Sequence, residues 1–182
     1  MKLILKLTGL AITASIIIFL GAGLFSSQDF DGSVNTTLVS PPEDIWPLIS
    51  KPKERESRLG ITSISRLDQN ALGFATWTEN GPKDAWARYE ILEENEPKKL
   101  TIAMMSSSQK LTGLWTYTLS SNDGIHTILT IHETSRLNNF MEQSLNTLKG
   151  RNSHLRAELR NITRTLRQAP STQNSIDATT AN

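Results

Sequence analysis

The sequence contains no cysteine among its 182 residues. This absence excludes disulfides, thiolate metal sites, a cysteine nucleophile and a lipid-modified N-terminal cysteine. It does not fix the cellular compartment, because a protein without cysteine tolerates either redox state.

An excess of charge is also missing. The formal net charge is +1, and without Lys2, Lys6 and Asp177 near the two ends the chain carries 17 basic and 17 acidic residues. A neutral body argues against a dedicated nucleic-acid binder. We therefore expect no nucleic acid among the partners.

Common catalytic and cofactor signatures are absent too. His126, His132 and His154 are too scattered for a local metal site, and the sequence has neither a P-loop nor a G-x-S-x-G elbow. We expect no metal and no cofactor. The sequence identifies no catalytic residue, and a non-enzymatic role is favoured while catalysis stays open.

The N-terminal region is the one long apolar run. Residues 7–28 carry no charge, and the apolar stretch Leu7–Phe25 would span roughly 28 Å as a helix, close to the thickness of a bilayer. Lys2 and Lys6 precede it, so the positive-inside rule places residues 1–6 in the cytosol. The sequence thus predicts a single-pass transmembrane anchor at residues 7–28.

After the anchor, residues 29–32 read as a short linker to a domain on the extracytoplasmic side, periplasmic or extracellular. Two alternatives remain open for the apolar run. It is either a signal peptide, cleaved to release a secreted protein, or a buried core helix.

The middle of the chain reads as short helices and then a series of strands. Residues 40–50 predict a short helix with prolines and acidic residues in its first turn, and residues 51–58 a charged second helix or loop. Short connections favour antiparallel neighbours. The expected strands are 33–39, 61–67, 72–79, 84–93, 99–105, 110–120 and 125–134.

The last segment, Ser135 to Arg167, contains no proline and predicts one helix of about nine turns. Its apolar residues recur at steps of three and four and form a narrow seam that needs a receiving surface. These are Met141, Leu145, Leu148, Leu155, Leu159, Ile162 and Leu166. The predicted fold is α+β: a curved, seven-stranded antiparallel sheet around a long C-terminal helix, over residues 33–167. Residues 168–182 read as a disordered tail.

Three local sequences resemble motifs of one superfamily. Residues 39–50 read VSPPEDIWPLIS, similar to an aPPeeVWplls opening; residues 113–119 read GLWTYTL, similar to GxWxYxL; residues 127–134 read TILTIHET, similar to TxLTxxE. Together with the element order, they make the chain resemble the START-like polyketide cyclase/dehydrase and lipid-transport (SRPBCC) superfamily, which has the helix-grip fold.

The resemblance implies a cavity between the sheet and the long helix that holds an apolar or amphipathic molecule. It implies no catalytic residues, since the superfamily has no universal catalytic motif. One departure concerns the cavity mouth: many relatives carry a second tryptophan after the first helix, where this chain has residues 54–58, ERESR.

Candidate ligand-binding residues lie on the expected strands, where core packing and surface exposure are the competing interpretations. His132 is also a candidate general base, provided that it faces the cavity. The candidates are Trp77, Trp86, Arg88, Tyr89, Trp115, Tyr117, His132 and Glu133.

Three functions follow from these observations. The leading hypothesis is a membrane-tethered domain that binds a hydrophobic or amphipathic, lipid-like molecule. The alternatives are a cyclase/dehydrase-type enzyme on the same fold, and a non-catalytic envelope or partner-binding protein.

Overall fold

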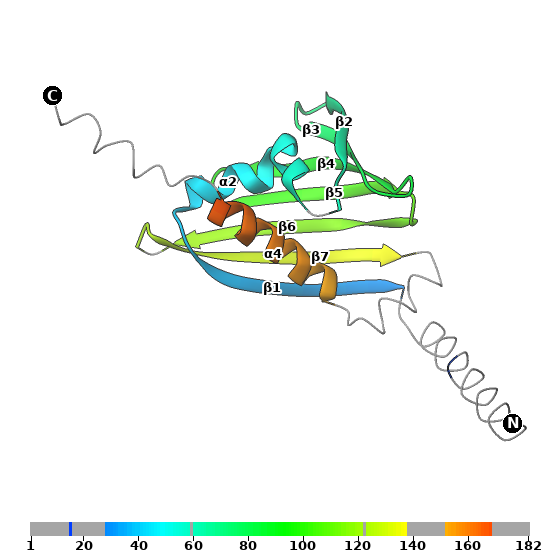
Figure 1. Ribbon diagram of the computed structural model, residues 1–182. Coiled ribbons are helices and arrows are strands. Elements are labelled where there is room, and N and C mark those ends of the chain that lie inside the picture. Colours follow the sequence, from blue (N-terminus) through cyan, green and yellow to red (C-terminus); the bar gives the residue numbers. More distant parts are fainter. Residues whose placement is uncertain (1–14, 16–27, 59, 122, 138–151, 169–182) are drawn as a thin grey trace, which may run out of the picture.

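The computed structural model describes residues 15, 28–58, 60–121, 123–137 and 152–168 (Figure 1). Within them, seven strands form one antiparallel sheet in the order β1-β7-β6-β5-β4-β3-β2. The strands are β1 (Asp29–Val39), β2 (Ser63–Gln69), β3 (Ala75–Asn80), β4 (Trp86–Asn95), β5 (Lys99–Ser107), β6 (Leu111–Ser121) and β7 (His126–Leu137). The α+β class and the seven-stranded sheet predicted from the sequence are confirmed.

The first strand pairs with the last. β1 lies antiparallel to β7 over its whole length, from the pair Asp29 and Arg136 to the pair Val39 and His126. Arg136 also donates two side-chain hydrogen bonds to Asp29, at 2.6 and 2.9 Å. The expected linker at residues 29–32 is therefore wrong: these residues belong to β1, because β7 runs on to Leu137 and supplies their partners.

The helices lie on one face of the sheet (Figure 1). They are α2 (Pro42–Ser50), the 3-10 helix η1 (Pro52–Ser57) and α4 (Ser153–Gln168). α4 contacts α2, β1 and β7. We call the face that these helices cover the inner face, and the opposite one the outer face.

The predicted helix over residues 135–167 is correct only in part. Ser135 to Leu137 continue β7, since they pair with residues 111–113 of β6, and the described helix begins at Ser153. Residues 138–151, with three of the seam leucines and methionines, lie outside the described residues. Within α4 the seam is confirmed: Leu155 and Ile162 are buried in the core, and Leu159 and Leu166 pack against it.

The core fills much of the inner face. Alternate residues of each strand point to it, so Tyr117 and Leu119 of β6 and Leu129 and Ile131 of β7 are all buried. On the outer face, Leu114 is 41% exposed. Residues two positions apart on these strands therefore share a face, as the pleat of a β-strand requires.

No helix among the described residues is both long and apolar enough to cross a membrane. The anchor expected at residues 7–28 lies almost wholly outside these residues, as does the expected tail apart from Gln168, which ends α4.

Candidate functional site

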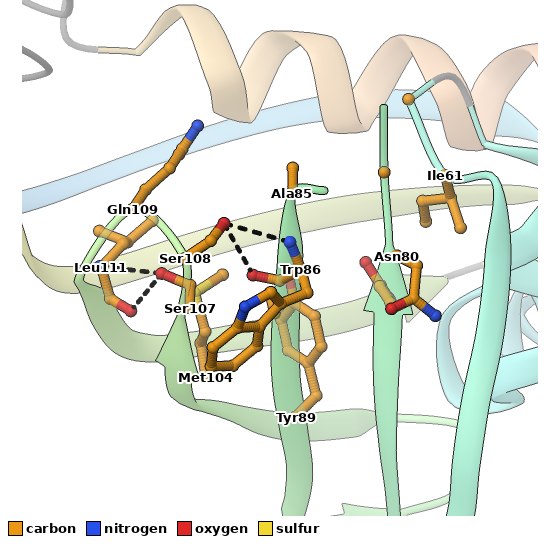
Figure 2. Close-up of a pocket in the computed structure, with 14 residues that line it drawn as sticks. Ile61, Asn80, Ala85, Trp86, Tyr89, Met104, Ser107, Ser108, Gln109 and Leu111 are labelled. Carbon is orange, nitrogen blue, oxygen red and sulfur yellow. Dashed lines mark hydrogen bonds between the residues drawn. The ribbon is translucent and has the colours of Figure 1, made fainter. Parts of the chain in front are cut away.

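A pocket of about 200 Å³ opens at one end of the inner face (Figure 2). It lies over two rows of register partners that cross strands β3, β4 and β5. Tyr89 and Met104 lie side by side in one row, and Glu79, Ala87 and Ser107 form the next. The pocket wall is thus a property of strand register. None of the described residues of α4 lines this pocket, so it is not the cavity between the sheet and the C-terminal helix that the resemblance implied.

The turn between β5 and β6 closes one side of the pocket. The Ser107 hydroxyl donates to the carbonyl of Leu111 at 3.0 Å and accepts from its amide at 2.9 Å. The Ser108 hydroxyl bonds the backbone of Trp86 in the same way, accepting from the amide at 3.1 Å and donating to the carbonyl at 3.3 Å. These serines fix the turn against the pocket, and their hydroxyls are occupied by backbone groups.

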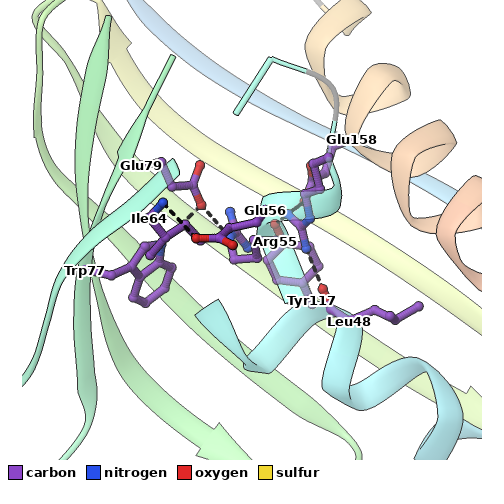
Figure 3. A network of polar contacts seen from close by, with 9 residues as sticks. Leu48, Arg55, Glu56, Ile64, Trp77, Glu79, Tyr117 and Glu158 are labelled. Carbon is purple, nitrogen blue, oxygen red and sulfur yellow. Dashed lines mark hydrogen bonds and ion pairs between the residues drawn. The ribbon is translucent and has the colours of Figure 1, made fainter. Parts of the chain in front are cut away.

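A buried ion pair stands behind the pocket wall (Figure 3). Glu79, which lines the pocket, accepts hydrogen bonds from Arg55 Nε at 2.5 Å and from Trp77 Nε1 at 3.1 Å. The Arg55 guanidinium carbon lies 5.4 Å from the ring centroids of both Trp77 and Tyr89. A cation at such a distance is attracted to aromatic rings.

Electrostatics keep these groups in defined states. Burial lowers the pKa of the Arg55 guanidinium, but the charge of Glu79 together with smaller contributions from Tyr117, Glu158 and Tyr89 outweighs burial, and that pKa lies well above its ordinary value. Burial, helped by the charge of Glu79, raises the pKa of Tyr89 well above its ordinary value. Arg55 is therefore a cation, and Tyr89 presents a neutral phenol to the pocket.

A second ion pair joins η1 to α4. Arg58 Nη1 donates to Glu158 Oε1, and Arg58 Nη2 donates to the carbonyl of Leu48 at 2.7 Å. The Tyr117 hydroxyl donates to the same Glu158 oxygen at 2.9 Å. These contacts tie the middle of α4 to α2, η1 and β6.

The two pairs form one charge-balanced cluster of Arg55, Arg58, Glu79 and Glu158. Burial raises the pKa of Glu158, but the charges of Arg58 and Arg55 and two hydrogen bonds lower it below its ordinary value overall. Burying an isolated charge costs free energy, and the attraction between the two cations and the two carboxylates offsets this cost.

A third polar group lies elsewhere on the inner face, at the start of α4. The Glu133 side chain is 1% exposed, and its oxygens lie 2.5 Å from Ser135 Oγ and 2.5 Å from His154 Nε2. The His154 ring packs edge-on against Phe30, with centroids 5.1 Å apart. This group fastens α4 to β7 and β1.

The structure separates the eight candidate residues predicted from the sequence. Trp86 and Tyr89 line the pocket. Trp77 and Tyr117 are buried in the core, Trp115 packs against it, and Glu133 is buried beside α4. Arg88 is exposed and His132 is half-buried on the outer face.

His132 lacks the placement that a general base required. Its neighbours Ile131 and Glu133 are buried on the inner face, so His132 points outward, where Nε2 lies 3.3 Å from Asp31. His132 does not face the cavity, so the prediction that it serves as a general base is wrong.

Sequence reasoning missed the four charged residues of the cluster. Arg55 and Arg58 lie in the segment that departs from the superfamily pattern, which was the available signal. Glu158 lies between the seam residues Leu155 and Leu159 on α4, and Glu79 follows Trp77 by two residues on the same face of β3. Neither acid is conspicuous, because burial of a charge depends on a partner that is distant in sequence.

Neither a family model nor a curated protein matches the sequence. Solved structures do resemble the fold. The Zhui aromatase/cyclase from Streptomyces sp. R1128 aligns with a TM-score of 0.62 at 7% identity, covering 77% of this chain and 94% of that one. A START superfamily protein from Mycobacterium smegmatis aligns with a TM-score of 0.61 at 8% identity, covering 77% and 99%.

The chain has a START-like helix-grip fold. A protein from Mesorhizobium loti aligns at 15% identity with a TM-score of 0.58, covering 78% of this chain and 99% of that one. The START-like fold predicted from the three motifs is confirmed. At such identities the likeness establishes the fold alone.

Proposed function

We propose that this START-like domain binds a small hydrophobic or amphipathic molecule in the pocket on its inner face. The observation that carries the proposal is the pocket itself, which combines apolar and polar walls. The START-like fold supports it, since that fold suggests ligand binding or cyclase-type function.

The size of the pocket limits what it encloses. A cavity of about 150 Å³ holds a benzene molecule. The pocket of about 200 Å³ therefore encloses one ring or a short acyl segment, and a larger ligand would extend past the exposed Trp86.

The lining favours a molecule with an apolar body. Tyr89, Met104 and Leu111 present carbon surface, and the only charged group among the described lining residues is Glu79, which Arg55 neutralises. A pocket of this kind offers apolar contact over most of its wall and polar contact at a few points.

Native mass spectrometry of the gently purified full chain tests the proposal. We expect a bound apolar molecule at one per chain. Ala87→Leu should remove it by filling the pocket, whereas the control Thr118→Leu, on the exposed outer face of β6, should retain it. A wild-type chain that never carries or takes up such a molecule would refute the function, as would equal occupancy in both variants.

We also propose that residues 7–28 tether the domain to a membrane, with the START-like domain on the extracytoplasmic side. The support is the uncharged run of residues preceded by Lys2 and Lys6. The full chain should resist extraction by alkaline carbonate and be digested by protease added outside the cell. A soluble chain whose N-terminus begins after the apolar run would instead establish cleavage of a signal peptide.

Cyclase-type catalysis on the same fold remains the alternative for the pocket. The outward position of His132 removes its candidate base.

A further inference from the structure

Glu79 is the one charged residue among the described residues that line the pocket, and one of its two carboxylate oxygens is unused. Oε1 accepts hydrogen bonds from Arg55 Nε at 2.5 Å and from Trp77 Nε1 at 3.1 Å. Oε2 accepts from no described residue, yet it does not belong to the fully buried unpaired polar atoms of the described chain, which lie on two arginines. Oε2 is therefore an open acceptor with accessible surface.

The accessible surface of the Glu79 carboxylate faces the pocket. The Glu79 side chain is 11% exposed, whereas Arg55 and Trp77, which donate to Oε1, are only 5% and 1% exposed. These buried neighbours close one side of the carboxylate, and Figure 3 shows the second oxygen pointing away from both of them. The side that stays open is the pocket that Glu79 lines.

Strand register brings this oxygen within reach of a bound molecule. Glu79 on β3 is the register partner of Ala87 on β4, so their side chains stand next to each other on the inner face. The Cβ atoms of such partners lie about 4.5–5.5 Å apart. Ala87 also lines the pocket, and its side chain ends at Cβ, so the space above it belongs to the pocket. A molecule that fills this space lies beside the Glu79 carboxylate.

Charge decides which donor suits Oε2. The cluster of two arginines and two glutamates is already balanced, so a ligand cation would add an unpaired charge beside the Arg55 guanidinium. A ligand anion has no donor for Oε2, whereas a hydroxyl group donates one hydrogen bond and adds no charge. We propose that Glu79 is a specificity-determining residue of the pocket and that it selects neutral ligands whose hydroxyl group donates to Oε2.

This inference rests on the proposed pocket function, and an isomeric pair of probes separates the two. The compounds para-fluorobenzyl alcohol and para-fluoroanisole contain the same atoms, but only the alcohol has a hydrogen-bond donor. Both carry an oxygen acceptor, so the neutral phenol of Tyr89 does not distinguish them. A third probe, para-fluorobenzylamine, is a cation at neutral pH. Binding is measured by fluorine NMR on the full chain in lipid nanodiscs, with empty nanodiscs subtracted.

The wild-type protein should bind the alcohol more tightly than the anisole, although the anisole is the more apolar isomer. The reason is that the anisole covers Oε2 without supplying a donor, and a buried charged acceptor left unpaired costs free energy. The amine should bind more weakly than the alcohol. This comparison uses no variant, so it stands even where a variant folds poorly.

The variant Glu79→Gln keeps the shape of the side chain and replaces the open acceptor by a donor, since Arg55 and Trp77 hold the remaining oxygen. The advantage of the alcohol over the anisole should fall by about tenfold, as expected for one hydrogen bond to a charged group. Glu158→Gln is the matched control, because it removes the same charge from the cluster at a residue outside the described pocket lining. This control should retain the advantage.

Three results would overturn the assignment while leaving the pocket function intact. If the anisole binds the wild-type protein as tightly as the alcohol, then Oε2 makes no contact with the ligand. If Glu79→Gln keeps the advantage, or Glu158→Gln loses it to the same extent, then another acceptor or the charge balance of the cluster is responsible. Tightest binding of the amine would contradict the charge argument. Failure of all three probes to bind would overturn both the inference and the proposed pocket.

Discussion

Glu158 joins α4 to the buried cluster of Arg55, Arg58 and Glu79, and its removal should show how much the cluster contributes to the free energy of unfolding. Glu158→Leu leaves Arg58 without its carboxylate and the Tyr117 hydroxyl without its acceptor. Removing one partner of a buried ion pair costs about 3–5 kcal/mol. Because the Glu158 side chain is 19% exposed, we expect the lower end, about 3 kcal/mol.

A double-mutant cycle tests whether this cost comes from the stranded arginine. Arg58→Leu strands Glu158 and also leaves the Leu48 carbonyl without a donor. The double variant removes both charges, so it should be no less stable than Arg58→Leu alone, which gives a coupling of about 3 kcal/mol or more, the whole cost of Glu158→Leu. Arg160→Leu on the exposed side of α4 is the control and should change stability by less than about 0.5 kcal/mol.

Urea unfolding of the full chain, followed by the fluorescence of the buried Trp46 and Trp77, measures these free energies. The pH dependence gives an independent check. The pKa of Glu158 is lowered in the folded protein, so the ionised carboxylate stabilises the fold above pH 4.5, the ordinary pKa of this group. This stabilisation is lost as the pH falls below 4.5 and through the lowered pKa. Glu158→Leu should therefore flatten the acid limb of the stability profile. A cost below about 1 kcal/mol, or strictly additive single variants, would refute the reasoning.

Three further outcomes follow from buried contacts and are measured by the same unfolding experiments. Burial raises the pKa of Tyr117 from 10.0 to about 12, so the neutral phenol stabilises the folded protein below pH 10, and this stabilisation is lost as the pH rises towards 12. In Tyr117→Phe the alkaline loss of stability should be smaller, because Tyr89 is then the one tyrosine left in the chain. Gly113→Ala places a Cβ 2.5 Å from Ser135 Cβ and should cost about 1–3 kcal/mol through backbone displacement, and an unchanged stability would contradict the register of β6 on β7. His154→Ala leaves the buried carboxylate of Glu133 with the Ser135 hydroxyl as its only side-chain partner among the described residues and should cost about 1–3 kcal/mol, whereas no loss would show that solvent reaches Glu133 freely.

The architecture of the described domain could be predicted well because it rests on local patterns. The strands expected at residues 110–120 and 125–134 are present, and the short connections correctly predicted antiparallel neighbours. Boundaries were less accurate. Asp29 to Gly32 enter the sheet because residues 133–136 of β7, about a hundred residues later in the sequence, offer hydrogen-bonding partners. Ser135 to Leu137 extend β7 because residues 111–113 of β6 pair with them.

The candidate site was only partly accessible for a related reason. Aromatic residues on strands were selected by type, so Trp86 and Tyr89 were found with others that serve the core, such as Trp77. Sequence patterns offer no means of choosing among these aromatic residues, because the pocket is formed by register between β3, β4 and β5.

Local patterns in the sequence were enough to predict the class of fold, the order of its elements and a START-like resemblance. All of these depend on spacing within a segment. Other features follow from contacts between segments that are distant in sequence: His132 faces outward, Arg55 and Arg58 are buried, and Arg55 Nη1 has no acceptor among the described residues. An arginine in a charged segment such as residues 51–58 is normally solvated. It enters a core only where carboxylates from β3 and α4 converge on it, and that convergence is a property of the folded chain.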